Sequence, residues 1–214
     1  TLYSITSDVS GIFIVPESVK TIATGAMANC SNVDTLILLS NIDKIEDKSI
    51  NSEQLTRVYM LGKDSATSIN ENVFINSENQ NAPVVYVQSS LYDEYVDLWS
   101  TTIGENFTNV LEKDELEIKN IDDNVILKSI NGSILLKGSQ AEDFNTDTFP
   151  IDIVEIGANA FKDNKKVKNI TLGDSVETIG KSAFYNAQNL ETLYSKRTEN
   201  IYVEKNSFYK VNKL

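Results

Sequence analysis

The chain has 214 residues, 41% of them apolar, and a formal net charge of −12. This length and apolar content allow one long domain or two short ones. The negative charge repels nucleic-acid phosphates and anionic lipid headgroups, so neither is expected as a partner. The sequence has no histidine, which excludes the catalytic systems and zinc sites that depend on this residue.

The sequence also lacks the signals of an internal disulfide, a membrane span and a phosphate-binding loop. The only cysteine is Cys30, so no internal disulfide can form. No apolar run approaches the ~20 residues of a membrane-spanning helix, so no membrane insertion is expected. There is no phosphate-binding glycine loop, and we expect no cofactor. The start at Thr1, without Met or a leader, favours a processed or trimmed segment of a longer chain.

The N-terminal part of the chain repeats one apolar pattern. Ile22 and Ile45 are 23 residues apart, and so are Met27 and Ile50. A third, looser copy places Phe74 24 residues after Ile50. Each copy contains a segment of alternating apolar residues, which is typical of a half-buried strand, and a shorter β-branched segment that we read as a second strand.

A helix is expected after these copies, over residues 89–100. Its apolar residues recur at spacings of three and four and predict one buried face. They are Leu91, Tyr92, Tyr95, Val96, Leu98 and Trp99. An amphipathic helix following a β-rich stack can close the exposed apolar edge of that stack.

The middle of the chain interrupts the period. Residues 112–117 are expected to form a charged linker. Two strand-like runs, 125–127 and 134–137, flank Asn131-Gly132, a strong hairpin-turn signal. Residues 118–150 are therefore predicted to cap a second stack, as residues 1–15 are predicted to cap the first.

The pattern returns in its clearest form in the C-terminal part. Phe161 and Phe184 are 23 residues apart, and Phe208 follows 24 residues later. A period of this size indicates one supersecondary unit copied in tandem, whose copies must stack to bury their apolar faces. The short segment around each Phe is expected to form one helical turn that places the ring in the core.

These elements predict an α/β, β-rich solenoid of ~23-residue units, right-handed, with short strands and single helical turns, interrupted by one amphipathic helix. Residues 1–111 are expected to form a first stack closed by the helix 89–100. Residues 112–214 are expected to form a second, with its cap at 118–150 and its repeats at 151–214.

The sequence pattern of these copies resembles the BspA-type leucine-rich repeat. It is Val-x-x-Ile-Gly-x-x-Ala-Phe-x-x-(Cys/Asn)-x-x-Leu-x-x-Ile-x-Leu. The segments 153–172 and 176–193 match it best, and 19–38 and 42–60 match well. Cys30 stands where that family often has a cysteine in the internal stack, so we expect it to be buried. The resemblance implies a surface-displayed or secreted protein of bacteria or of some parasitic protists, with a role in adhesion, host-protein binding or nutrient-complex assembly. It supplies no shared catalytic residues.

A ligand is expected on the outward side of the longer strands, where Ile and Tyr alternate with core positions. Such residues with a polar rim have the composition of an interface, although strand surfaces also favour them for cross-strand packing alone. The candidate ligand-binding residues are Ile37, Arg57, Tyr59 and Tyr86 in the first stack, and Lys168, Thr171 and Tyr194 in the second.

The leading hypothesis is a non-enzymatic extracellular or cell-surface module that recognises a protein or a glycan. The alternative is a structural spacer of a larger surface protein, without a ligand of its own. A third hypothesis, an acidic hydrolase built on a parallel β-helix, requires carboxylates with a raised pKa clustered in a groove, on one strand face. The acidic runs 112–117 and 122–124 supply oxygen ligands for Ca²⁺, but they lack a calcium-loop pattern and are read as solvated charge, so no metal site is expected.

Overall fold

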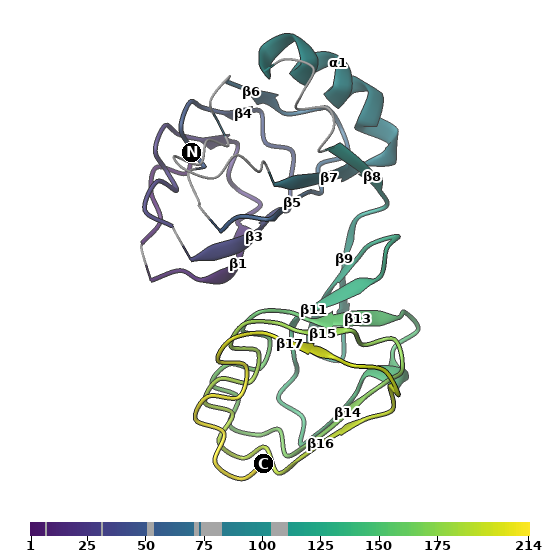
Figure 1. The fold of residues 1–214 in the computed structure, drawn as a ribbon. Coiled ribbons are helices and arrows are strands. Elements are labelled where there is room, and N and C mark those ends of the chain that lie inside the picture. Colours follow the sequence, from purple (N-terminus) through teal and green to yellow (C-terminus); the bar gives the residue numbers. More distant parts are fainter. Residues whose placement is uncertain (7, 31, 51–53, 71–72, 74–82, 104–110) are drawn as a thin grey trace. The chain divides into compact units, whose positions relative to one another are not determined.

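The computed structural model describes residues 1–214 except 7, 31, 51–53, 71–72, 74–82 and 104–110. The chain divides into two compact units, Thr1–Leu116 and Glu117–Leu214 (Figure 1). Each unit is a coil of short strands, as the repeats predict. The boundary falls after Leu116, whereas the sequence placed it after residue 111.

The first unit contains two sheets made only of parallel strand pairs within the described residues. The longer strands form the sheet β1-β3-β5-β7-β8, and the short β-branched strands form the sheet β2-β4-β6. The elements are β1 (Gly11–Val15), β2 (Thr21–Ile22), β3 (Val33–Leu38), β4 (Lys44–Ile45), β5 (Arg57–Met60), β6 (Ser68–Ile69), β7 (Val84–Gln88), the 3₁₀ turn η1 (Ser89–Leu91), α1 (Tyr92–Ile103) and β8 (Leu111–Asp114).

The second unit has the same two-sheet plan with an added hairpin. One sheet has the order β17-β15-β13-β11-β10-β9 and the other the order β12-β14-β16. The elements are β9 (Glu117–Ile121), β10 (Asn124–Lys128), β11 (Ser133–Lys137), β12 (Asp143–Asn145), the 3₁₀ turn η3 (Thr146–Thr148), β13 (Ile153–Ile156), β14 (Asn169–Leu172), β15 (Thr178–Ile179), β16 (Thr192–Ser195) and β17 (Tyr202–Val203).

A ladder of phenyl rings fills the core of the second unit. Phe161 and Phe184 stack with their centroids 5.2 Å apart, and Phe208 stacks on Phe184 at the same distance. Phe144 begins the ladder with an edge-on contact to Phe161 at 4.9 Å. Backbone hydrogen bonds join successive turns; the Phe161 N–H, for example, donates to the Ala183 carbonyl at 2.7 Å. The prediction that the Ala-Phe turn is internal is confirmed.

Met27 and Ile50 occupy the equivalent place in the first unit, and both are buried. Phe74, expected as the aromatic of the third copy, lies outside the described residues. Cys30 is fully buried in the same core, as expected. Burial raises the pKa of its thiol, which makes it a poor nucleophile.

The turn that carries each core residue needs a left-handed backbone two positions earlier. This position is Gly25 in the first copy, with φ +71°, and Lys48, Asn159, Ser182 and Asn206 in later copies, with φ between +50° and +63°. Only glycine adopts such values without a steric penalty. Gly25 is therefore the counterpart of Asn159, not of Gly157.

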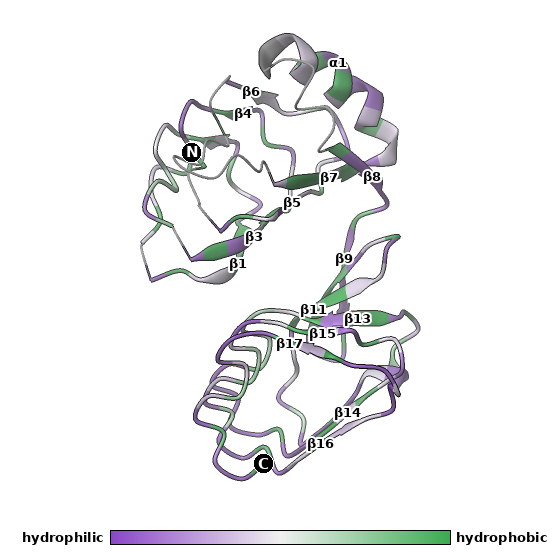
Figure 2. Cartoon of the chain, in the orientation of Figure 1, coloured by the Kyte–Doolittle hydropathy of each residue, from purple (hydrophilic) through white to green (hydrophobic). Residues whose placement is uncertain are grey.

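The helix closes one end of the first unit. It begins with η1, continues as α1 to Ile103 and packs against β6 and β8. Trp99 is fully buried, and its indole N–H donates to the Thr67 carbonyl at 2.8 Å. Figure 2 shows both hydrophobic and hydrophilic residues on α1, and the apolar Tyr95 and Trp99 lie in the core of the unit, as an amphipathic lid requires. In the described part of the chain, no helix is long and apolar enough to cross a membrane.

The expected linker 112–117 is not a linker. Residues 111–114 form β8, which pairs in parallel with β7 and buries Leu111 in the core. The Gln88 side chain then holds Leu116, donating to its carbonyl at 2.8 Å and accepting from its N–H at 3.2 Å. These contacts extend the first unit to Leu116.

The predicted hairpin is present, with β10 and β11 antiparallel around Asn131-Gly132. A third strand, β9, pairs antiparallel with β10 through the tight turn Asp122-Asp123. Both aspartates have left-handed φ values, 47° and 62°. The sheet continues from β11 into β13 in parallel, so the hairpin extends one sheet of the coil.

Candidate functional site

The outer face of the larger sheet in the first unit carries one column of side chains. Strand pairing aligns Ile14, Ile37, Tyr59 and Tyr86 across four strands. Their strand neighbours, such as Leu36 and Val58, belong to the core, so this column lies on the opposite face. The rings of Tyr59 and Tyr86 stack with centroids 4.7 Å apart and planes 13° from parallel.

The expectation that this whole column is exposed is wrong. Ile37 is 0% exposed and Tyr59 only 4% exposed, whereas Tyr86 is half-buried. Adjacent strands lie only ~4.8 Å apart, so bulky side chains in one column shield each other. Ile37 lies between Ile14 and Tyr59, and Tyr59 lies between Ile37 and Tyr86. The two half-buried ends of the column, Ile14 and Tyr86, are thus the parts that solvent reaches, and Tyr86 is the aromatic one.

Charged groups surround Tyr86. Burial raises the pKa of its phenol, the Arg57 guanidinium opposes that shift, and the carboxylates of Glu112 and Asp114 add to it. Glu112 is paired with Tyr86 in the strand register and is exposed. The half-buried Arg57 lies one strand away in the adjoining column. The predicted residues Arg57, Tyr59 and Tyr86 therefore share one neighbourhood.

The corresponding face of the second unit is polar. Pairing aligns Asp143, Asn169 and Thr192 in one column. The Asn169 amide donates to Asp143 Oδ1 at 2.7 Å, and the Thr192 hydroxyl donates to Asn169 Oδ1 at 2.7 Å. This ladder satisfies its own hydrogen bonds.

The three residues predicted in the second stack do not form one cluster. Thr171 and Tyr194 are paired in adjacent strands, and Tyr194 is 62% exposed. Lys168 precedes β14, and its ammonium lies 3.1 Å from the Glu142 carboxylate. Tyr194 is the one large aromatic group on this face that solvent reaches among the described residues of β12, β14 and β16.

The two units differ in charge. Residues 1–116 contain 6 basic and 17 acidic residues, a net charge of −11, whereas residues 117–214 contain 13 and 14, a net charge of −1. Almost all of the negative charge therefore belongs to the first unit.

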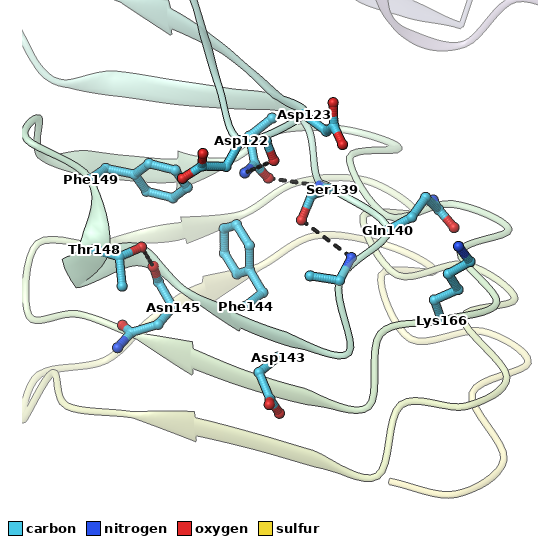
Figure 3. A pocket seen from close by; sticks show the side chains of 12 residues that line it. Asp122, Asp123, Ser139, Gln140, Asp143, Phe144, Asn145, Thr148, Phe149 and Lys166 are labelled. Carbon is cyan, nitrogen blue, oxygen red and sulfur yellow. Dashed lines mark hydrogen bonds between the residues drawn. The ribbon is translucent and has the colours of Figure 1, made fainter.

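Sequence reasoning missed a cavity in the second unit, which has a volume of about 480 Å³ (Figure 3). The turn Asp122–Asn124 lines one side of it, and β12 with Phe149 lines another. Ser139, Gln140 and Lys166 complete the wall. The acidic turn was visible in the sequence, but its position opposite β12 depends on the unexpected pairing of β9 with β10.

The carboxylates of this cavity come from a turn and an edge strand. They are not gathered on one strand face, which the hydrolase hypothesis requires. Among the described residues, no group of three or more His, Cys, Asp or Glu side chains is arranged to hold a metal ion.

Comparison with known proteins gives one family match. The model of the BspA type Leucine rich repeat region matches residues 7–83 and 139–214, in six copies. No curated protein matches the chain.

Solved structures similar to this chain include those of three proteins. The pneumococcal vaccine antigen PcpA is 16% identical, with a TM-score of 0.40 over 96% of this chain and 65% of that one. A leucine rich cell surface protein from Faecalibacterium prausnitzii is 20% identical, with a TM-score of 0.36 over 82% and 51%. A leucine-rich repeat protein from Eubacterium ventriosum is 14% identical, with a TM-score of 0.30 over 88% and 60%. The chain thus spans less than two thirds of each of these proteins.

Proposed function

Because the chain belongs to the BspA-type leucine-rich repeat family, we propose that it is a non-enzymatic recognition module of a secreted or cell-surface protein. It binds a protein or a glycan through the outer faces of its longer strands, in the sheets β1-β3-β5-β7-β8 and β12-β14-β16. The family and its repeat architecture support a binding or adhesion role. The kind of ligand and the cellular location are part of what we propose.

The observation that carries the proposal is the tyrosine pair of the first unit. Tyr59 is buried on the neighbouring strand, and its ring stacks against that of Tyr86, which holds the Tyr86 ring in one orientation before any partner arrives. A rigid aromatic side chain loses little conformational entropy on binding and is a frequent centre of interface affinity. Arg57 and Glu112 beside it supply groups for hydrogen bonds and ion pairs.

The charge of the first unit favours a basic protein as its partner. With a net charge of −11 on residues 1–116, association is accelerated by complementary charge and slowed by salt. In the second unit, Tyr194 and its neighbour Thr171 offer a ring face and a hydroxyl, which suit a glycan or a polar protein surface.

One observation favours the alternative function, a spacer without a ligand. The outer ladder of the second unit is satisfied internally, through Asn169 with Asp143 and Lys168 with Glu142. Polar groups that already have partners gain little from a ligand. This internal pairing therefore favours the spacer role for residues 117–214.

A binding screen separates the two functions. The intact chain is immobilised and offered extracellular-matrix proteins and a glycan panel at low and at physiological salt. Recognition predicts capture of a defined partner that weakens as salt rises. Capture of nothing at either salt concentration, with the chain folded, favours the spacer.

The variants Tyr86→Ala and Tyr202→Ala identify the face. Tyr202 is the matched control, since it is 68% exposed on β17 and lies outside the proposed faces. The proposal predicts weaker capture by Tyr86→Ala and unchanged capture by Tyr202→Ala.

A further inference from the structure

The two sheets of the second unit begin at different points. The hairpin β9–β11 extends one sheet beyond β13, but the other sheet begins at β12. Within the described residues, β12 pairs with β14 on one side and with no strand on the other. The free side of an edge strand presents backbone N–H and C=O groups that can pair with another chain. On β12 these are the groups of Asp143 and the N–H of Asn145, because the Asn145 carbonyl already accepts from the Thr148 hydroxyl at 2.7 Å (Figure 3).

The cavity described above lies at this edge. Residues of β12 and the following 3₁₀ turn form one wall, and the Asp122–Asn124 turn forms the wall across from it. Its volume, about 480 Å³, falls within the ~300–1,000 Å³ typical of ligand sites. The hairpin thus leaves room for an added segment beside β12.

The walls are held in place by internal contacts. Asn124 is 3% exposed, and its amide oxygen accepts from the Ser139 N–H at 2.7 Å. The same amide donates to the Ile121 carbonyl at 3.0 Å. On the other side, the ring of Phe149 contacts Phe144, the first ring of the core ladder, with centroids 5.7 Å apart. The cavity is therefore largely formed before a ligand binds.

The lining combines an apolar surface with negative charge. Phe149 is half-buried and offers an apolar surface, and the exposed Asp122 and Asp123 lie on the opposite turn. Asp143 also lines the cavity, but its carboxylate points away from the Asp122–Asp123 turn (Figure 3), and its Oδ1 accepts from Asn169. Lys166 is the only cation of the lining, so the cavity is net negative. An aliphatic stem with a cationic end, as in lysine or arginine, matches this combination.

We propose that this cavity binds an extended peptide segment with a basic side chain. The segment pairs its backbone with the free edge of β12, and its ammonium or guanidinium group lies beside Asp122 and Asp123. This is strand addition, in which backbone hydrogen bonds supply affinity and a side-chain pocket supplies specificity. A glycan has no backbone amides to pair with β12, so a peptide uses more of the site. The site is independent of the sheet face around Tyr86.

The charge requirement is tested with the double variant Asp122→Asn/Asp123→Asn on the intact chain. Asparagine adopts the left-handed conformation of this turn readily, so the fold is expected to survive. The matched control is Asp163→Asn/Asp174→Asn, which removes two charges elsewhere in the unit; Asp163 also has a left-handed φ of 58°. The probe is a pool of blocked pentapeptides with central lysine and Val, Thr, Ser or Tyr elsewhere, compared with pools carrying glutamate or norleucine at the centre.

The proposal predicts that the lysine pool is retained and shifts the backbone amide NMR signals of Asp143 and Asn145. The glutamate pool is not retained, and norleucine is retained at least roughly tenfold less, as expected for loss of a charge-assisted contact. The Asp122→Asn/Asp123→Asn variant loses the preference for lysine, and the control variant keeps it. Equal retention of all three pools, or no retention of any, overturns the proposal.

The pairing requirement is tested with N-methylated peptides made from one retained sequence. In a strand pair, alternate residues direct their N–H groups to the partner. Methylation at one set of alternate residues must abolish binding, and methylation at the other must leave it largely intact. Binding that survives both methylations overturns strand addition. Neutral oligosaccharides that shift Asp143 and Asn145 when the peptides do not would identify a glycan site instead and equally overturn it.

Discussion

Phe161 and Phe184 are 23 residues apart in sequence, yet their rings lie nearly parallel with centroids 5.2 Å apart and neither reaches solvent. Each ring forms one layer of the column that joins successive coils of the second unit. The stability of that unit therefore depends on every ring in the column, because a missing layer leaves a void between two coils.

The first prediction concerns that void. Phe184→Ala should lower the free energy of unfolding by ~3–5 kcal/mol, because the ring is fully enclosed between Phe161 and Phe208. Phe208→Ala should cost less, since Phe208 is only partly buried. Urea unfolding of both variants measures the difference. A loss below ~1 kcal/mol for Phe184→Ala would contradict the enclosed column.

The second prediction concerns the left-handed turn position. A methyl group built on Gly25 meets no atom within 4 Å, so any penalty for Gly25→Ala comes from its φ of +71°. The variant should lose ~1 kcal/mol of stability, and Gly25→Asn should lose less, because asparagine tolerates this conformation and occupies the equivalent positions 159 and 206. Thermal unfolding ranks the two variants, and equal stability of both with the wild type would argue against the strain.

The third prediction concerns the end of the first unit. Gln88→Ala removes both side-chain bonds to the buried backbone of Leu116 and should cost ~1–3 kcal/mol. Amide hydrogen exchange at Leu116 should accelerate in this variant. Gln140→Ala is the matched control, since Gln140 is exposed. Unchanged exchange at Leu116 would show that Gln88 does not hold the boundary.

The fourth prediction concerns alkaline pH. Burial raises the pKa of Tyr86 above the ordinary value of 10. The unfolded state therefore loses the phenol proton at lower pH than the folded state does. The protonated Tyr86 phenol thus contributes fully to stability below pH 10, and this contribution is lost as pH rises through the folded pKa. The wild type should lose stability relative to Tyr86→Phe across that range. Parallel pH profiles for the two proteins would mean that Tyr86 is not shielded.

The repeat architecture could be predicted because its signal is local and recurs. The spacing of Ile156 and Ile179 and of Phe161 and Phe184 fixes the register of the stack, and Asn131-Gly132 fixes a hairpin turn without any long-range information. The amphipathic helix could also be predicted, because its apolar residues recur at spacings of three and four and mark one buried face.

The exposure of the candidate site could not be predicted from alternation alone. Alternation assigns Ile37 and Tyr59 to the outer face, but it does not show how far side chains in adjacent coils cover each other. The cavity could not be predicted either. The sequence alone indicates that Asp122 and Asp123 belong to a solvated acidic run, and only the pairing of β9 with β10 places them in a turn that lines a cavity. Both features arise from non-local contacts.

The central claim is that the face around Tyr86 recognises a partner, and the most direct test compares dissociation constants for a partner captured by the intact chain. Tyr59→Ala is unsuitable, since Tyr59 is buried and its truncation would disturb the sheet. Tyr86→Ala should weaken binding roughly tenfold or more, about 1.4 kcal/mol, while Tyr202→Ala leaves it unchanged. Equal affinity of the two variants, with both chains folded, would contradict recognition through this face.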